Sequence, residues 1–498
     1  MTATCKLMRK YLIMILFVLL LASLLSCNSS TSPKVGSLSG VVQLVNDTGD
    51  EANDPLDHSG VTIALYELAN LDTIVTNART AFPSVGFPID QNSEFDHRLG
   101  TCIAETTSDA SGAFVLSKVH YGTYNLVIMK SGWGFRYEYS VKIDGESSLV
   151  PIEGLILYPE RAISGFIQGS IVLDNWRHLL VLDDVLLSPE SSLSLGPNAV
   201  VRINPGKKLD IMGTIVTTAY QGGMFRVTSN DAIFFTDQQD KNDILSYYSL
   251  NLLSSAIVTD AKISWGNFWF GSTGLVSCLS HGLEIQNCNF YSSDNGFVAS
   301  NSASPSIGLS VFRSIGHINN SLSTYNAGYG DISRNVIIGG SIGIQCEATS
   351  APFITNNVLI DCYSGIQIID SESIVKNNLI RGSVIGIQAA GHYYPLLSQN
   401  NVSANRTIVI GYSWNFTHSR AIINRNNLDA SEYLYFVMMG NAYDIDATNN
   451  YHYTNDPNEI ESKTYHKPDY APASQQSVSY VIYIPFSSSL ITSAGPQD

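Results

Sequence analysis

The residues best suited to chemistry follow two neighbouring copies of a Gly-Ile-Gln triplet. Asp370 and Glu372 come after one copy, and His392, Tyr393 and Tyr394 come after the next. Carboxylates beside an imidazole can serve as general acid and base, and phenol rings can pack on the faces of sugar rings. If the two segments stack, the five side chains form a candidate catalytic or binding edge. The alternative is a solvated loop edge without a site.

These triplets belong to a repeat, which predicts the elements that position them. Gly343, Gly365 and Gly386 begin the copies, 22 and 21 residues apart. A second word, Asn-Asn, recurs at Asn356-Asn357, Asn377-Asn378, Asn400-Asn401, Asn426-Asn427 and Asn449-Asn450. A period in the low twenties with short apolar runs indicates a solenoid of stacked coils. We therefore interpret the repeated words as structural. Asparagine takes left-handed corners and stacks its amides, isoleucine fills the core, and glutamine faces outward.

The segment "LLVLDDVLLSPESSLSLGPNAVVRINPGKKLDIMG" places short apolar runs between Pro/Gly turns. Residues 159–456 resemble a right-handed parallel β-helix of the pectate-lyase-like and NosD-like superfamily, so the expected fold class is all-β. This resemblance implies a polysaccharide lyase or glycoside hydrolase working in a groove, a non-catalytic binding or structural module, or a metal-handling periplasmic protein. Asp370 and Glu372 lack the third carboxylate that would complete a Ca²⁺ cage. Met438-Met439 is the one sequence feature that suggests copper, so no cofactor is expected.

A second candidate site is aromatic. "SWGNFWFGS" brings Trp265 and Trp269 into one short strand-like run. Alternation would leave some of these rings outside, where they could stack on sugars. The competing interpretation is packing in the core or between domains.

The N-terminus predicts export. Residues 1–26 combine a basic start with an apolar run, as a signal peptide does. They resemble a bacterial lipoprotein signal, which implies a lipidated Cys27 as the new N-terminus, a tether over 27–36, and anchoring in a lipid bilayer. Asn28 after the cysteine favours the outer membrane or cell surface. A formal net charge of −16 argues against nucleic acid as a partner.

Residues 37–158 predict short strands joined by turns. Asp109-x-x-Gly112-x-Phe114 and Gly122-x-Tyr124 resemble the carboxypeptidase regulatory-like (transthyretin-like) β-sandwich, which implies a spacer or binding module. A long insertion from Leu71 to Leu99 could be a binding loop or an ornate edge.

Residues 457–498 predict a cap over the end of the solenoid, with Asp456 capping a short helix and a last strand within Val478–Ile484. The cysteines are expected to be buried thiols, with Cys278–Cys288 and Cys346–Cys362 disulfides as alternatives. The preferred hypothesis is an exported, membrane-anchored β-helix that binds polysaccharide without catalysis. The alternatives are a carbohydrate-active enzyme and a NosD-like protein.

Overall fold

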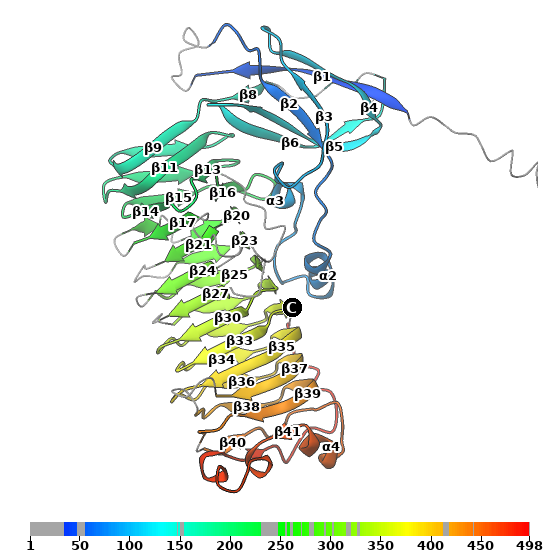
Figure 1. Cartoon of the computed structure of the whole chain (residues 1–498), viewed down its shortest axis with the longest axis vertical. Helices are drawn as coiled ribbons and strands as arrows, with labels where there is room; N and C mark the ends of the chain where they lie inside the picture. The colour runs from blue at the N-terminus through cyan, green and yellow to red at the C-terminus, as the bar shows by residue number, and fades with distance from the viewer. Residues whose placement is uncertain are drawn as a thin grey trace, which may run out of the picture.

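A small pair of β-sheets sits at the N-terminal end of a long parallel β-solenoid (Figure 1). The computed structural model describes residues 34–46, 55–146, 148–149, 154–230, 248–253, 256–258, 262–269, 271–277, 283–292, 295–300, 303–314, 320–325, 329–411, 418–441 and 443–497. The predicted signal peptide, Cys27 and Cys278 lie outside these residues. The all-β fold class is confirmed.

The N-terminal sheets enclose their own apolar core. One antiparallel sheet has the order β3 (Cys102–Thr107), β2 (Thr62–Tyr66), β5 (Gly122–Lys130), β6 (Gly134–Ile143). The other has β4 (Ala113–His120) beside β1 (Val35–Leu44), which also pairs with β7 (Ser148–Leu149) and β8 (Leu155–Leu157). Alternate residues such as Leu38, Ile63 and Ile128 face inward and are fully buried. β1 begins at Val35, two residues before the predicted start of the sandwich at 37.

The solenoid is a right-handed parallel β-helix of about ten turns. One face is a ten-stranded parallel sheet. Its strands are β19 (Lys262–Ser264), β22 (Glu284–Gln286), β25 (Ser306–Gly308), β28 (Asp331–Ser333), β31 (Phe353–Thr355), β34 (Ile374–Lys376), β36 (Leu396–Ser398), β38 (Ile422–Asn424), β40 (Ile445–Asp446) and β42 (Val481–Ile482). A shorter sheet nearer the N-terminus contains β10 (Ser170–Leu173), β12 (Ser192–Leu195), β15 (Thr214–Thr217) and β18 (Ile257–Val258).

The remaining strands form the other faces and pair in parallel from coil to coil. They are β9 (Arg161–Ile167), β11 (His178–Leu187), β13 (Val200–Ile203), β14 (Lys208–Ile211), β16 (Phe225–Ser229), β17 (Tyr248–Leu252), β20 (Gly266–Trp269), β21 (Gly271–Ser277), β23 (Asn289–Ser292), β24 (Asn295–Ser300), β26 (Val311–Ser314), β27 (Asn320–Tyr325), β29 (Val336–Ile338), β30 (Ile342–Glu347), β32 (Val358–Ile360), β33 (Ser364–Ile369), β35 (Leu379–Ala390), β37 (Asn401–Ile410), β39 (Asn427–Val437) and β41 (Thr464–Tyr465). Their inward side chains merge into one continuous apolar core along the rod.

Asparagines build one corner of the later coils. A buried ladder runs through Asn335, Asn357, Asn378, Asn400, Asn426 and Asn450, in which each side-chain amide donates to the next Oδ1 at 2.9–3.0 Å. The residue before each of them has positive φ, as at Asn356 and Arg425. The ladder therefore uses the second asparagine of the pairs at 356, 377 and 449, but the first asparagine of the pairs at 400 and 426. The two asparagines of a pair are not equivalent, and the register of the word shifts by one residue along the rod.

The Gly-Ile-Gln words stack in register on β30, β33 and β35. The isoleucines lie in the core, as predicted. The glutamines lie on the opposite face and form a second ladder, in which Gln367 Nε2 donates to Gln388 Oε1 at 2.9 Å. Gln367 is nevertheless only 4% exposed, so this outward ladder is shielded from water.

The C-terminal cap has the predicted start but is not separate from the solenoid. Asp456 Oδ1 accepts from the backbone N–H of Asn458 at the start of α4 (Pro457–Ser462). β41 then pairs with β39, and β42 pairs with β40, so the parallel ladder extends beyond the expected boundary at 456. The 3₁₀ turns η5 (Lys467–Asp469) and η6 (Gln475–Ser477) complete the cap.

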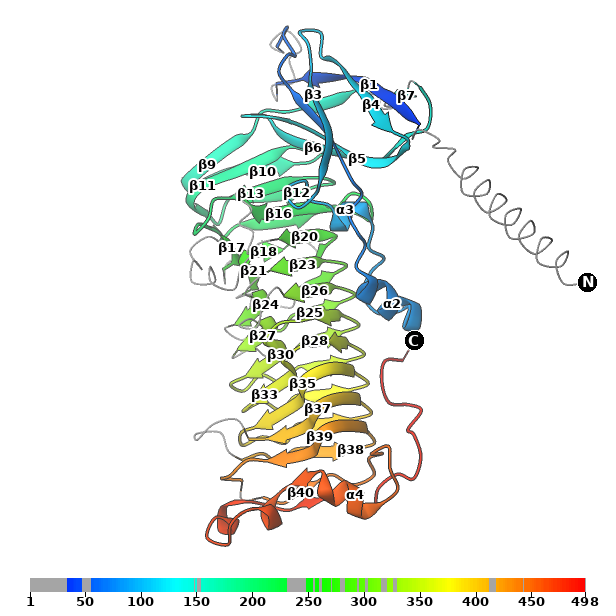
Figure 2. The same ribbon diagram turned by 45° about the vertical axis from the view of Figure 1, so that its right-hand side comes forward.

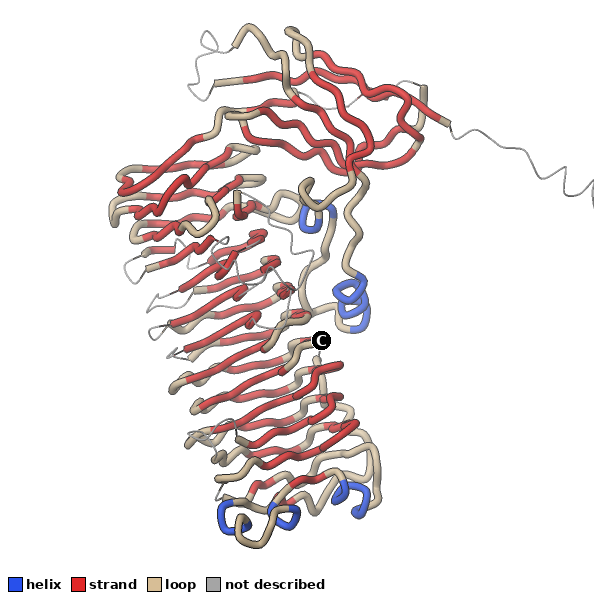
Figure 3. Tube along the Cα trace, in the orientation of Figure 1, coloured by secondary structure: helices blue, strands red, loops and turns tan. Residues whose placement is uncertain are grey.

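Two segments from opposite ends of the chain lie along the same side of the rod (Figure 2). The insertion carries the helices α2 (Thr73–Ala81) and α3 (Gln91–Glu94), which lie along one side of the solenoid (blue, Figure 3). Its apolar side chains, including Val75 and Phe87, pack on Val336 and Val358 of the coils. The tail after residue 485 runs back along the asparagine corner, where the Asn377 side chain donates to Ser493 O at 2.6 Å.

The described cysteines are all free. Cys288, Cys346 and Cys362 are buried and Cys102 is exposed. The Cys346–Cys362 disulfide alternative is therefore wrong, and burial raises the pKa of the Cys362 thiol to about 12.

Candidate ligand-binding site

The stacked repeats bring Asp370 and His392 into contact. His392 Nδ1 lies 3.2 Å from Asp370 Oδ1, and the backbone N–H of His392 donates to the same oxygen at 3.0 Å. Gly391, with φ +110°, permits this approach, because a Cβ at that position would lie 2.5 Å from the backbone of Asp370. The His392 side chain is 67% exposed, so the pair sits on an open edge of the rod.

The other three predicted members of this edge make no contact with the Asp370–His392 pair that could transfer a proton. Glu372 is exposed, and its carboxylate makes no hydrogen bond or ion pair with any described residue. Tyr393 is half-buried, whereas Tyr394 is 50% exposed. The five predicted residues therefore share an edge, but only Asp370 and His392 form a contact that could transfer a proton.

The next coil adds a cation between aromatic rings. The Arg420 guanidinium carbon lies 3.9 Å from the centroid of the Tyr443 ring and 5.2 Å from that of Tyr394. Its N–H also donates to the Tyr394 hydroxyl. Arg420 is half-exposed, and its hydrogen bonds to Tyr443 and Tyr394 raise its pKa further. The rings hold the guanidinium in place while donors remain for a ligand.

His418 joins this patch to the Asp370–His392 pair. Its ring centroid lies 5.0 Å from that of His392 and 6.4 Å from that of Tyr443. We define the edge patch by its six members, Asp370, His392, Tyr394, His418, Arg420 and Tyr443. It combines two half-exposed phenol rings, a guanidinium and two imidazoles with a single carboxylate.

Sequence reasoning missed His418, Arg420 and Tyr443 because no Gly-Ile-Gln triplet follows Gly386. The spacing of the ladder asparagines could have located these residues. Asn400 and Asn426 are neighbours in the ladder and are 26 residues apart. The same offset takes His392 to His418 and Tyr394 to Arg420.

The tryptophan candidates are not at an open surface. Trp269 is only 2% exposed, and its ring lies 5.3 Å from the Arg226 guanidinium. Trp265 is half-buried and meets Phe87 of the insertion edge-on at 6.0 Å. The expectation of exposed, sugar-stacking rings is therefore wrong for Trp269 and unsupported for Trp265. Trp265 packs against the insertion and Trp269 packs within the solenoid, which agrees with the competing interpretation.

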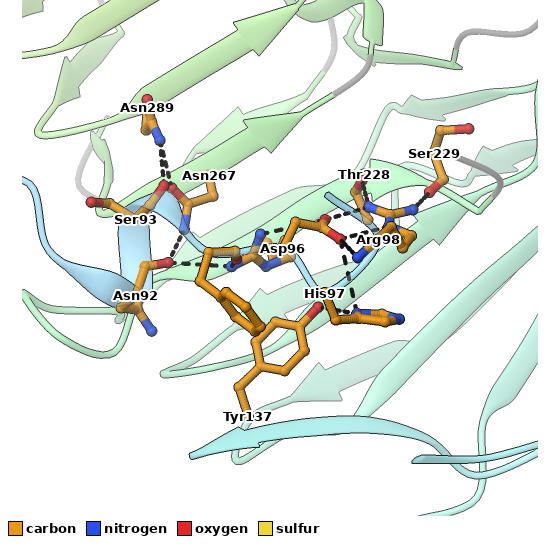
Figure 4. A network of polar contacts seen from close by, with 12 residues as sticks. Asn92, Ser93, Asp96, His97, Arg98, Tyr137, Thr228, Ser229, Asn267 and Asn289 are labelled. Atoms are coloured by element: carbon orange, nitrogen blue, oxygen red, sulfur yellow. Dashed lines mark hydrogen bonds and ion pairs between the residues drawn. The ribbon is translucent and has the colours of Figure 1, made fainter. Parts of the chain in front are cut away.

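The insertion itself is a clasp between the N-terminal sheets and the solenoid (Figure 4). Asp96 is fully buried, and Arg98 pairs with it at 2.6 Å while donating to Ser229 O and Thr228 Oγ1 of β16. Farther along, Asn289 of β23 donates to Ser93 O at 2.8 Å. These contacts join the insertion to the solenoid.

The buried Asp96 at the centre of this clasp stays ionised because two arginines lie beside it. Burial disfavours ionisation of Asp96, but the charges and hydrogen bonds of Arg98 and Arg226 outweigh it and hold the pKa of Asp96 well below its usual range. Burial, opposed by Asp96 and reinforced by Arg98, lowers the pKa of His97 to about 4. His97 instead lies 2.7 Å from the Tyr137 hydroxyl as a neutral partner. Such a network stabilises an interface and leaves no free acid or base.

The described residues contain neither a metal-binding cluster nor a membrane-spanning helix. No group of three His, Cys, Asp or Glu side chains that could hold a metal occurs among the described residues. Every described helix is too short or too polar to span a lipid bilayer.

The fold and the repeat define a class, the right-handed parallel β-helix domain. Residues 249–407 match the family model described as "Right handed beta helix region", which covers the coils from β17 into β37. No curated protein and no solved structure shows significant similarity to the chain.

Proposed function

We propose that this protein is an exported, lipid-anchored β-helix that binds polysaccharide at the edge patch without cleaving it. Lipidation at Cys27, after a lipoprotein-like signal in residues 1–26, would tether the rod at the outer membrane or cell surface. The N-terminal sheets would act as a carboxypeptidase regulatory-like spacer between the tether and the rod.

The observation that carries the binding proposal is Arg420 held between Tyr394 and Tyr443. Rings about half exposed offer flat apolar faces to sugar rings, and a positioned guanidinium suits a sugar carboxylate. His392 and His418 extend the hydrogen-bonding surface along the rod. We therefore infer that acidic polysaccharides bind in preference to neutral ones.

A second candidate function is cleavage of the same polysaccharide. The Asp370–His392 contact favours it, because a carboxylate beside an imidazole can orient a general base. The exposure of His392 and the isolation of Glu372 weigh toward binding alone. A NosD-like metal-handling role is a third proposal, and no described cluster supports it.

The test is a panel of neutral and uronate-containing polysaccharides, scored for binding and for new reducing or unsaturated ends. Arg420→Gln should weaken binding of the acidic members about tenfold or more, since it removes a charge-assisted hydrogen bond. Tyr443→Ala should weaken neutral and acidic members alike.

Arg381→Gln and Tyr363→Ala serve as matched controls, because both side chains are exposed on other parts of the rod. Equal losses in the patch and control variants would reject the edge patch as the site. Product formation that disappears in His392→Gln would replace the binding proposal with the enzyme.

A further inference from the structure

A cavity of about 460 Å³ opens where the three parts of the molecule meet. Lys130 lines it from the N-terminal sheets, His97 and Arg98 from the insertion, and Glu160, Arg202 and Asn230 from the start of the solenoid. It is separate from the edge patch, which lies coils away toward the other end of the rod. Its volume matches that of sites for small organic ligands.

Cations outnumber carboxylates around this cavity. Lys130, Arg98 and Arg202 face one lining carboxylate, Glu160, which pairs with Arg202. Asp96 lies behind the lining, where it pairs with Arg98 and also approaches Arg226 at 3.8 Å. His97, with its pKa lowered to about 4, is neutral near pH 7 and changes neither count. Four cations therefore face two carboxylates around this cavity, and Asp57 adds an electrostatic attraction for Lys130 from outside the lining.

Two of these cations retain donors that the described residues do not use. Lys130 makes no ion pair with any described carboxylate, and its ammonium donates to the carbonyl oxygen of Ser59 at 2.7 Å. The Nε of Arg202 is buried and has no hydrogen-bond partner among the described residues. An anion in the cavity would accept a charge-assisted hydrogen bond from the N–H groups of Lys130 that the described residues leave free.

The remaining lining suits a polyhydroxylated molecule better than a simple ion. Asn230, Ser131 and Thr62 supply neutral polar groups, while Phe135 and Met129 supply apolar surface. An inorganic anion would fill only a small part of the cavity and would leave the neutral polar and apolar lining residues without contacts. We propose that this junction cavity binds a sugar acid of one or two rings, with its carboxylate near Lys130 and Arg202.

Calorimetric titration of the full chain in detergent tests the proposal, with D-glucuronate as the probe and D-glucose and inorganic phosphate as comparisons. Glucuronate should bind, glucose should not, and phosphate should bind at least tenfold more weakly than glucuronate. Lys130→Gln should weaken glucuronate about tenfold, because it removes a charge-assisted hydrogen bond. Ser131→Glu, at an exposed position of the lining, should weaken it as much by repulsion.

Lys142→Gln is the matched control, because this lysine lies on the same sheets with its side chain 69% exposed. It should leave glucuronate binding unchanged, and so should Arg420→Gln, which separates this cavity from the edge patch. Thermal unfolding confirms that each variant is folded. Binding of glucose as tight as glucuronate, phosphate as tight as glucuronate, or equal affinities in Lys130→Gln, Ser131→Glu and Lys142→Gln would each overturn the proposal.

Discussion

At the scale of single residues, the ladder asparagines do more than turn a corner. Asn378 Oδ1 accepts from both the backbone N–H and the side chain of Asn357 at 3.0 Å. Its own amide donates to Asn400 Oδ1 and to the carbonyl oxygen of Ile354. Each ladder asparagine thus satisfies buried groups in both neighbouring coils, and no apolar residue of that size can do so.

Asn378→Ala should therefore lower the free energy of unfolding by about 2–4 kcal/mol, because the backbone N–H and one side-chain N–H of Asn357 lose their acceptor in the interior. Denaturant unfolding measures the change. Asn405→Ala, at an exposed asparagine of β37 outside the ladder, should cost about 0.5 kcal/mol or less. A cost of that small size at Asn378 would mean that the ladder does not stabilise the coils.

Buried histidines make the fold sensitive to acid. His452 is 4% exposed and shares a 2.9 Å hydrogen bond with the Tyr435 hydroxyl. Burial lowers its pKa to about 4 from an ordinary value of 6.5. The unfolded chain therefore binds the proton more readily than the folded chain between these two values. The stability linked to His452 is fully present above pH 6.5 and is lost as the pH falls toward 4.

His452→Gln should flatten this decline, because glutamine keeps a polar partner for Tyr435 but does not titrate. Between pH 6.5 and 4, the free energy of unfolding of the wild type should fall more steeply than that of the variant, by at most about 1.4 kcal/mol per pH unit. The measured quantity is the slope of the free energy of unfolding against pH, and a loss of stability that is the same at every pH does not change that slope. Parallel slopes would contradict a neutral, buried His452.

At the scale of elements, two straps close one side of the rod. The insertion reaches Arg334, whose carbonyl oxygen accepts from Gly86 at 2.7 Å. The tail ends one coil later, where the backbone N–H of Gln497 donates to Asn356 Oδ1 at 3.0 Å. Segments from the two ends of the chain thus cover successive corners of the same edge. By covering these corners, the insertion and the tail shield backbone N–H and C=O groups that would otherwise be open to pairing with another chain.

The insertion is held by a buried ion pair whose removal should be costly. Arg313 forms a fork with Glu94 at 2.5 and 2.8 Å, and both side chains are under 10% exposed. Glu94→Gln should lower the free energy of unfolding by about 3–5 kcal/mol, because it leaves a buried guanidinium short of counter-charge. Denaturant unfolding again measures the loss.

The rod supplies a matched exposed pair as the control. Arg406 forms a similar fork with Glu432 at 2.9 Å, but these side chains are 35% and 44% exposed. Glu432→Gln should cost no more than about 1 kcal/mol, since water screens the pair. Similar costs for the two substitutions would show that the clasp does not depend on its charges.

At the scale of the whole molecule, a rigid rod separates the edge patch from the N-terminal end, where the anchor is proposed. The apolar core is continuous from Ile163 to Val481, so displacement of one coil disturbs its neighbours. The edge patch lies in the last coils, on the half of the rod far from residue 34 (Figure 1). This arrangement suits presentation of a binding edge away from a membrane.

Cys27→Ala should release the protein from the membrane fraction, because the thiol is the proposed acceptor of lipid and one signal-derived anchor carries the attachment. Fractionation followed by immunoblotting measures the change. Cys5→Ala removes the other N-terminal cysteine, inside the signal, and should stay in the membrane fraction. Membrane retention of the Cys27 variant would reject lipid anchoring.

The sequence by itself determined the solenoid, because the period of the Asn and Gly-Ile-Gln words is a local property that every coil must repeat. It also placed Asp370 and His392 at one edge, since their offset of 22 residues is within one residue of the spacing between Gly365 and Gly386. It could not place Arg420 and Tyr443, because the coil length changes to 26 residues beyond Asn400, nor could it choose between exposed and buried tryptophans.

Only the tertiary structure decided where the insertion lies and what it covers. Contacts such as Arg313 with Glu94 join residues 219 apart, and no periodic signal links such positions. The junction cavity has the same origin, since its lining comes from three parts of the chain. Because the coils repeat, the sequence pattern of a few of them predicts the fold of the rod. The clasp and the cavity depend on long-range packing that occurs only once in the chain, so no repeated pattern predicts them.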